Sequence, residues 1–308
     1  LLAARLDRLG PGERAVLERG AVVGKEFTAE DVRSLLDPAG APTADAHLRS
    51  LAGRGFVRPH DEGTFAFRHV LVQEAVYRAA PKRLRAELHE RFADRLDQPG
   101  RDIAELDEFV GYHLERAYRL RTELGESDRQ TARLSEDGGR RLGAAGIRAW
   151  KRNDVHATLG LLRRATALLS TDSVLRRELL CELAPALRTS GDSAGAADVL
   201  TDVIEEAKRD GDRRIELRAR LEHEYVRLIA ATGRPASALL DVASEGTAVF
   251  EAIGDHRSLG RSWLLVGFVE GAHRGHHEER QRAAERALEH YKRSNWPSST
   301  CLGEIANA

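Results

Sequence analysis

Glycines recur at a fixed interval in the second half of the chain, and this spacing restricts the fold more than any other feature. Gly191, Gly233 and Gly275 are 42 residues apart, and each ends a segment with helical periodicity. The pairs Gly211-Asp212 and Gly254-Asp255 are 43 residues apart and mark a second turn within each interval. A fixed period of this length is typical of repeat proteins, in which each helical hairpin buries its apolar face against its neighbours.

Equivalent positions in successive repeats carry related residues. The first helices align Leu179, Leu221 and Trp263, and the second helices carry small residues at matching places. Trp263-x2-Val266-Gly267 matches the W-x2-L-G opening of a tetratricopeptide with Val for Leu, although Glu270 stands at the later Tyr position. Because the unit is longer than the ~34 residues of a standard tetratricopeptide, we predict elongated tetratricopeptide-like repeats over residues 128–308, with a looser first pair at 139–151 and 154–170.

The first 98 residues have the element order of a winged helix. Thr28 and Thr43 are expected N-caps of the second and third helices, the latter spanning Ala44–Arg54. An alternating segment, Phe65–Phe67, follows a turn-forming cluster and predicts a small hairpin with Phe56-Val57. A further helix is predicted to open at His69 and to break at Pro81.

Residues 99–127 are predicted to form a connecting helix. A one-sided apolar stripe supports this prediction and comprises Ile103, Leu106, Val110, Leu114 and Ala117. The expected fold is therefore mainly α: a winged-helix module with a small β-hairpin and flanking helices (1–98), the connecting helix (99–127) and an α-solenoid of tetratricopeptide-like helical hairpins (128–308).

Composition favours a helical protein without a global electrostatic preference for nucleic acid or membrane. Charged residues make up 31% and aromatic residues 5%, and the formal net charge is −1. The two cysteines are too few for a disulfide framework, and no apolar run approaches the ~18 residues that span a bilayer. We therefore expect a cytoplasmic chain with no membrane partner. The absence of Met, even at position 1, further suggests a piece of a longer protein.

The sequence offers no recognisable catalytic centre. There is no G-x-x-x-x-G-K-[ST] phosphate loop, so this segment is not expected to bind ATP alone or to act as an enzyme. His273, His276 and His277, with His256 in the preceding turn, form a histidine-rich group that lacks a matching Cys or carboxylate pattern, so no metal site is predicted. Cys181 is interpreted as a small core residue.

His89 and His113 lie within amphipathic helices and are interpreted as structural. Nothing in the sequence brings a Ser, a His and an Asp together, so no catalytic triad is predicted.

Three segments together resemble a family of regulatory proteins. They are ARLDRLGPGERAVLERGAVVGKEF at residues 4–27, FRHVLVQEAVY at 67–77 and RLRAELHERFADRLD at 83–97. They resemble the region just after the nucleotide-binding core of signal-transduction ATPases with numerous domains, the STAND class of AAA+-like switches. The continuation ELDEFVGYHLERAYRLRTELGE is similar to large actinobacterial regulators in which a class III adenylate/guanylate cyclase domain precedes the ATPase. The resemblance implies a parent chain with an ATPase core, a winged helix and helical repeats, in that order.

The resemblance also implies a role for one residue. In the family, a His at the start of the last winged-helix helix contacts the phosphates of bound ADP and holds the inactive state. Plant and animal members have Met-His-Asp, where this chain has Arg68-His69-Val70, so the His matches and the Asp does not. His69 is thus the predicted cofactor-binding residue of the full-length parent, with ATP or ADP as the cofactor. The alternative is that His69 only packs against its helix or caps it.

The leading hypothesis is a regulatory segment whose repeats bind a protein or peptide while the winged helix contacts the upstream ATPase core of the same chain. The alternative is a DNA-binding winged-helix transcriptional regulator with a repeat-based sensor. Asp45 in the third helix and Asp61-Glu62 at the wing tip oppose the alternative, because acids there would face phosphates. A third hypothesis is a helical scaffold without a switch.

Overall fold

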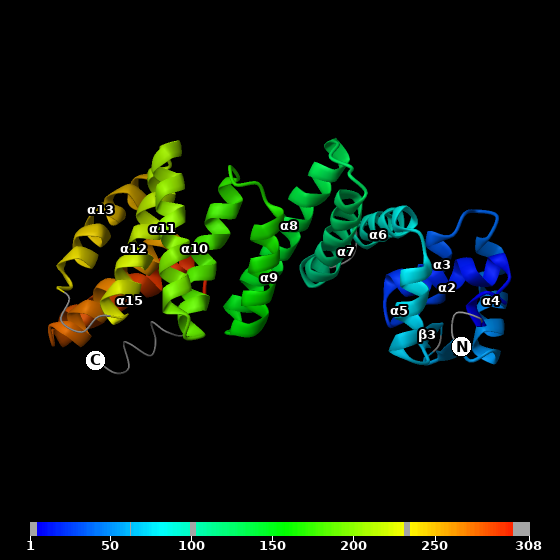
Figure 1. Cartoon of the computed structure of the whole chain (residues 1–308). Coiled ribbons are helices and arrows are strands. Elements are labelled where there is room, and N and C mark those ends of the chain that lie inside the picture. Colours follow the sequence, from blue (N-terminus) through cyan, green and yellow to red (C-terminus); the bar gives the residue numbers. More distant parts are fainter. Residues whose placement is uncertain (1–4, 62, 99–102, 231–234, 298–308) are drawn as a thin grey trace. The chain divides into compact units, whose positions relative to one another are not determined.

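The computed structural model describes residues 5–61, 63–98, 103–230 and 235–297, with the side chains of 103–105 excepted (Figure 1). It confirms the predicted fold class, which is mainly α with one small sheet. The chain divides into two compact units, Leu1–Ala144 and Ala145–Ala308, and the boundary falls inside helix α8, Arg129–Lys151. The predicted three-part division at residues 98 and 127 stays a prediction.

The N-terminal part of the first unit is a winged helix. Its sheet has the strand order β1-β3-β2 with both pairs antiparallel, and Val57 is opposite Phe67 as the predicted hairpin requires. The first strand was not predicted; it pairs Phe27 with Phe65 and completes the sheet. The elements are α2 Pro11–Val23, β1 Glu26–Thr28, α3 Ala29–Leu35, the turn η1 Ala41–Thr43, α4 Ala44–Gly53, β2 Val57–Pro59, β3 Thr64–Phe67 and α5 Val70–Ala79.

The two predicted threonine caps have different outcomes. Thr28 is confirmed: its hydroxyl accepts from the Asp31 amide at 3.0 Å, and the Asp31 carboxylate accepts from the Thr28 amide at 3.1 Å. Thr43 is the N-cap residue of α4 as predicted, but it closes a 3₁₀ turn, has helical backbone angles and makes no side-chain capping hydrogen bond. Its hydroxyl therefore points back and donates to the Gly40 carbonyl at 3.0 Å instead of capping α4.

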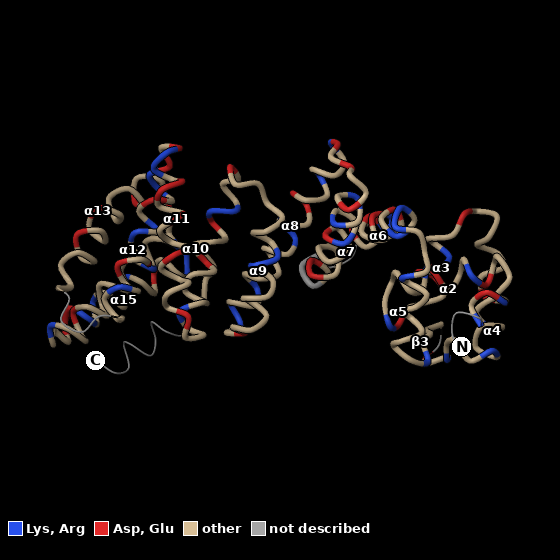
Figure 2. Tube along the Cα trace, in the orientation of Figure 1, with Lys and Arg blue, Asp and Glu red and all other residues tan. Residues whose placement is uncertain are grey.

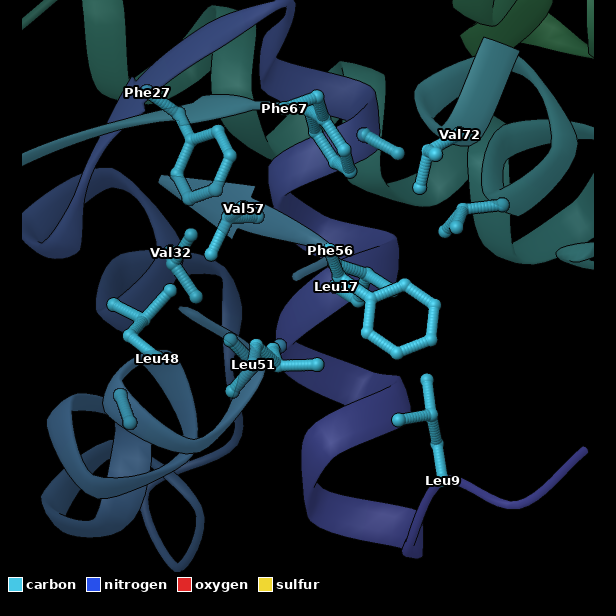
Figure 3. Close-up of a cluster of buried hydrophobic side chains, with 14 of the residues drawn as sticks. Leu9, Leu17, Phe27, Val32, Leu48, Leu51, Phe56, Val57, Phe67 and Val72 are labelled. Carbon is cyan, nitrogen blue, oxygen red and sulfur yellow. The ribbon is translucent and has the colours of Figure 1, made fainter. Parts of the chain in front are cut away.

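A single apolar core holds the winged helix together. Figure 3 shows side chains from α2, α3, α4 and the sheet converging, and Leu17, Leu48 and Leu51 among them are at most 1% exposed. Close approach of α2 to the sheet depends on Gly20, since a Cβ there would lie 2.8 Å from the Phe27 ring.

The rest of the first unit is helical. Chain direction changes at Pro81, which is the N-cap of α6 (Lys82–Leu96) and separates it from α5 as predicted. The next helix, α7, spans Ile103–Glu123. On its predicted stripe, Val110, Leu114 and Ala117 are buried, Leu106 is half-buried, and the side chain of Ile103 lies outside the described residues.

The second unit is an array of antiparallel helices, each of which packs against its neighbours in the sequence. The first helices α10, α12 and α14 also contact one another in order, as in a solenoid. The helices are α9 Val155–Leu168, α10 Val174–Thr189, α11 Ser193–Asp210, α12 Arg213–Ala230, α13 Ser237–Ile253, α14 His256–Phe268 with a π-helical turn at Val269–His273, and α15 His277–Arg293.

The turns between these helices explain the Gly-Asp pattern of the sequence. Gly211 and Gly254 end their helices with φ near +70°, a conformation that side chains disfavour. In Gly254-Asp255, the Asp255 carboxylate then accepts from the Ser258 amide at 3.0 Å and so caps the next helix. Each pair thus ends one helix and begins another. Gly233 lies outside the described residues.

In the part of the chain that the structure describes, no helix is both long and apolar enough to cross a bilayer.

Candidate functional site

His69 is the N-cap residue of α5, directly after strand β3, and its side chain is exposed. The ring makes no capping hydrogen bond to its own helix. The two following side chains are also exposed, Val70 to 51% and Leu71 to 68%. The residue is therefore available to a partner, and its contact with a nucleotide phosphate stays a prediction.

A pocket of about 460 Å³ lies beside α5 in the same unit. Val70 is on its rim, whereas His69 is not among its lining residues. Three arginines and one acidic side chain line it, together with two tyrosines: Glu74, Arg78, Arg85, Arg116, Tyr77 and Tyr112.

A buried polar network behind this pocket ties α5 to α6 and α7. Arg116 donates to the Tyr77 hydroxyl at 2.9 Å, and that hydroxyl lies 2.9 Å from His89 Nε2. His89 Nδ1 lies 2.7 Å from His113 Nδ1. Because the Tyr77 oxygen already accepts from Arg116, its hydrogen is directed to His89 Nε2, and His89 then donates from Nδ1 to His113.

Both histidines of this network are neutral at neutral pH, because their pKa values are lowered. Burial lowers the pKa of His113 to about 4, and burial together with His113 and nearby arginines lowers the pKa of His89 well below its ordinary value. The structural interpretation of both residues agrees with their burial at 0% and 1% exposure. What the sequence did not reveal is that the two rings are bonded to each other.

The third winged-helix helix, α4, presents a mixed surface to any nucleic acid. Arg54, just after α4, is held by an ion pair of 2.6 Å to Glu13 and a hydrogen bond of 3.1 Å to the Arg8 carbonyl. Asp45 is exposed on α4, and Asp61 is 82% exposed at the wing. Basic and acidic positions are interspersed over the winged helix (Figure 2), so its charges do not favour binding to a polyanion.

A cavity of about 500 Å³ lies in the second unit, against its first helices. We call it the repeat chamber. Its walls come from the end of α8, from α10, α12 and α14, and from the region after α15. The polar and aromatic lining residues on which the argument rests are Lys151, Glu182, Arg188, Arg218, Glu222, Tyr225, Arg257, Arg261 and Trp296.

Two buried glutamates connect neighbouring first helices across the chamber wall. Glu222 of α12 accepts two hydrogen bonds from Arg261 of α14, at 2.5 and 2.8 Å. Glu182 of α10 pairs with both Arg218 of α12 and Arg257 of α14. Each glutamate is about 5% exposed, so these pairs are largely removed from water.

Aromatic rings also contact several of the chamber cations. Arg188 and Arg261 lie against Tyr225, with guanidinium carbons 5.1 and 5.4 Å from its ring centroid. Arg257 lies 3.4 Å from the Trp296 centroid.

Lys151, at the end of α8, lies 5.1 Å from the same Trp296 ring and donates to the Asn295 carbonyl at 3.0 Å. Residues about 145 positions apart thus meet at one side of the chamber.

Cys181 also borders the chamber but offers no nucleophile. Its side chain is 2% exposed, and burial raises the pKa of its thiol to about 11, so the thiol stays protonated at neutral pH.

The histidine-rich group of the sequence does not form a single cluster. His276 Nδ1 lies 2.9 Å from a Glu270 carboxylate oxygen, and His256 Nδ1 lies 3.1 Å from His290 Nδ1. His256 is thus paired with α15 and not with His276. Among the described residues, no group of three or more His, Cys, Asp or Glu side chains could hold a metal ion.

Sequence reasoning missed the chamber residues because they come from distant helices. A partial signal was present, since α12 carries Arg218, Glu222 and Tyr225, and α14 carries Arg257 and Arg261, at intervals of three or four. Charged residues that recur at intervals of three or four on a buried face of a helix indicate a polar surface in the protein interior. The contribution of Lys151 and Trp296 had no signal of this kind.

Comparison with known proteins gives limited information. No protein-family model matches the sequence. A Rhizobium meliloti (strain 1021) protein, described only as uncharacterized, is 31% identical over 121 residues, which are 38% of this chain and 12% of that protein. The chain therefore spans a small part of the length of the curated relative that it matches.

Two solved structures are similar to the chain over most of its length. One is a STAND protein with a tetratricopeptide repeat sensor from Pyrococcus horikoshii, at 17% identity and a TM-score of 0.41, covering 98% of this chain and 48% of that one. The other is aspartyl phosphate phosphatase F from Bacillus subtilis, at 11% identity and a TM-score of 0.46, covering 96% and 77%. At these values neither likeness adds to the fold described above.

Proposed function

We propose that this chain is the regulatory and protein-interaction segment of a nucleotide-switched signalling ATPase of the STAND class. The supporting observation is His69, an exposed imidazole at the start of a ten-residue helix in a winged helix whose chain continues into helical repeats. The first turn of a helix has unpaired amides that favour an anion, and an imidazole there can donate to a phosphate oxygen.

In this proposal the nucleotide, ATP or ADP, is held by an upstream core of the same cytoplasmic chain, and this segment regulates it without catalysis of its own. The similarity of residues 105–126 to cyclase-linked regulators extends the proposal to a class III nucleotide cyclase as the output of the parent. The repeats bind a protein or peptide partner, because an array of helical hairpins presents an extended surface for such a partner.

The coding sequence upstream of Leu1 provides the first test. A G-x-x-x-x-G-K-[ST] motif between a strand and a helix is expected there. A reading frame without such a motif would contradict the proposal.

The second test uses the parent protein loaded with ADP. His69→Ala is expected to release ADP at least about tenfold faster, because one charge-assisted contact to phosphate is lost. His60→Ala, which changes an exposed histidine next to the wing, is the matched control. Equal ADP release from the His69 variant and the unchanged protein would support a scaffold without a switch.

DNA binding by the winged helix is the alternative, and the module does have a third helix and a wing in the required order. It predicts binding to duplex DNA that weakens steeply with salt and is reduced by Arg49→Gln on the exposed side of α4. Fluorescence anisotropy with a labelled duplex at two salt concentrations decides the question. We expect no salt-dependent binding, because acidic side chains occupy the same surface.

A further inference from the structure

The repeat chamber carries more positive than negative charge. Two glutamates face five cations, which are Lys151, Arg188, Arg218, Arg257 and Arg261. Both carboxylate oxygens of Glu222 accept hydrogen bonds from Arg261, and Glu182 forms ion pairs with Arg218 and Arg257. The described side chains of the chamber therefore leave a surplus of positive charge.

Two of the five cations form no ion pair with a carboxylate of the described residues, and a third shares its carboxylate with another arginine. Arg188 contacts Tyr225 but forms no ion pair with any described residue, and its Nε has no hydrogen-bond partner there. Lys151 donates to a backbone carbonyl and not to a carboxylate of the described residues. Arg257 has its Nη2 against the Glu182 carboxylate, which Arg218 also uses.

Two of the basic groups of the chamber have lowered pKa values. Burial, followed by the charge of Arg218, lowers the pKa of Arg257. Burial, followed by the charge of Arg257, lowers the pKa of Lys151. An anion between these groups would relieve the repulsion and supply the missing acceptors.

The size and shape of the chamber favour a small occupant. Its volume of about 500 Å³ lies within the range of small-molecule sites. Lys151, Asn295 and Trp296 contact each other at one side, so the wall there is closed and not an open groove along the array. Tyr225 and Trp296 supply aromatic rings next to Arg188 and Arg257.

We propose that the repeat chamber binds a small organic anion: a carboxylate or phosphate group attached to a planar or apolar body. The anionic group is held by Lys151 and Arg257, with Arg188 as a second contact, and the body lies against the aromatic side chains of the chamber. This site goes beyond the nucleotide switch and does not depend on it, because every residue involved belongs to the second unit.

Isothermal titration calorimetry on the 308-residue chain tests the proposal with three matched probes. Indole-3-acetate supplies a carboxylate, phenyl phosphate supplies a phosphate, and indole-3-acetamide is the uncharged counterpart of the first. At least one of the two anions is expected to bind about tenfold or more tightly than the amide, and which anion does so identifies the preferred group. Equal affinity for all three probes, or no binding of either anion, would overturn the proposal.

Two variants locate the site. Arg257→Gln and Arg188→Gln are each expected to weaken the favoured anion about fivefold or more, while Arg282→Gln, on the exposed face of α15, leaves it unchanged. Arg188 has no ion pair with a described residue to lose, so its variant remains informative even if Arg257→Gln does not fold. Affinity that is unaffected by Arg188→Gln contradicts the assignment.

A short peptide of four glutamates, acetylated and amidated at its ends, serves as a fourth probe. If it binds in the chamber and neither small anion does, the occupant is an acidic polypeptide segment and the small-molecule assignment is wrong.

Discussion

The first unit, which contains the winged helix, and the second unit, which contains the repeats, bury polar side chains in different ways. In the first, His89 and His113 lie in a buried network and carry no charge. In the second, Glu182 and Glu222 are also buried, but they form ion pairs with arginines. The difference follows from the groups themselves. An imidazole can lose its proton near neutral pH, whereas a guanidinium cannot and needs a counter-charge.

This contrast has a functional consequence. Neutral buried histidines make the first unit sensitive to acid but leave no charge to recruit a ligand. Half-buried arginines give the chamber of the second unit a positive charge, which the two chamber glutamates only partly balance. The first unit is thus built for a fixed geometry, and the second for binding an anion.

The largest expected effect comes from removing one shared carboxylate. Glu182→Gln keeps the side-chain shape but leaves Arg218 and Arg257 facing each other without a counter-charge. Since both arginines retain some contact with water, we expect a loss of about 2–4 kcal/mol in the free energy of unfolding. Urea unfolding followed by circular dichroism measures it.

The matched control is Glu289→Gln, which breaks an exposed pair with Arg293 within one helix. Its cost is expected to be below about 0.5 kcal/mol. If the two variants cost the same, the buried charges of the repeat unit contribute no more than surface charges, and the comparison between the units fails.

A smaller effect is expected from acid on the histidine network. The folded-state pKa of His113, about 4, lies below the ordinary value of 6.5, so the unfolded chain binds more protons between these values. Stability is therefore complete above about pH 6.5 and is lost as the pH falls toward 4, by up to about 3 kcal/mol for this residue. The free energy of unfolding, measured between about pH 7 and pH 4.5, gives the slope.

His113→Asn tests the assignment, because the amide oxygen can still accept from His89 but the side chain no longer titrates. In this interval, the slope of the unfolding free energy against pH should correspond to about one proton fewer taken up on unfolding. His60→Asn, an exposed change outside the network, is the control. An unchanged slope in the His113 variant would show that the acid sensitivity comes from other groups.

The smallest effects concern the turns of the repeat unit. Gly254→Ala forces a side chain into φ of +70° and is expected to cost about 1–2 kcal/mol. Gly160→Ala changes an exposed glycine within α9 that has open space around it, and is expected to stabilise by about 0.5–1 kcal/mol. Thermal unfolding of the two variants should shift in opposite directions. Shifts in the same direction would show that the repeat does not require the positive φ of Gly254.

Local signals predicted the fold well. Gly211-Asp212 and Gly254-Asp255 gave the helix boundaries, because the chemistry of ending one helix and capping the next lies in adjacent residues. The hairpin and the break at Pro81 were predicted for the same reason. Strand β1 was missed, since three residues have no periodicity and this strand exists only through pairing with β3. Thr43 was placed correctly at the N-cap of α4, but its hydroxyl does not cap, because the preceding 3₁₀ turn gives it helical backbone angles.

The sequence by itself determined the order of elements, the period of the repeats and the position of His69 at the start of a helix. All three depend on residues a few positions apart, where backbone geometry and side-chain spacing are sufficient. The contact between His89 and His113 and the convergence of Lys151, Arg188 and Arg257 on one chamber were decided only by the tertiary structure. Such groups come from separate helices, and their charge and hydrogen bonding depend on burial and on neighbours that no local pattern specifies.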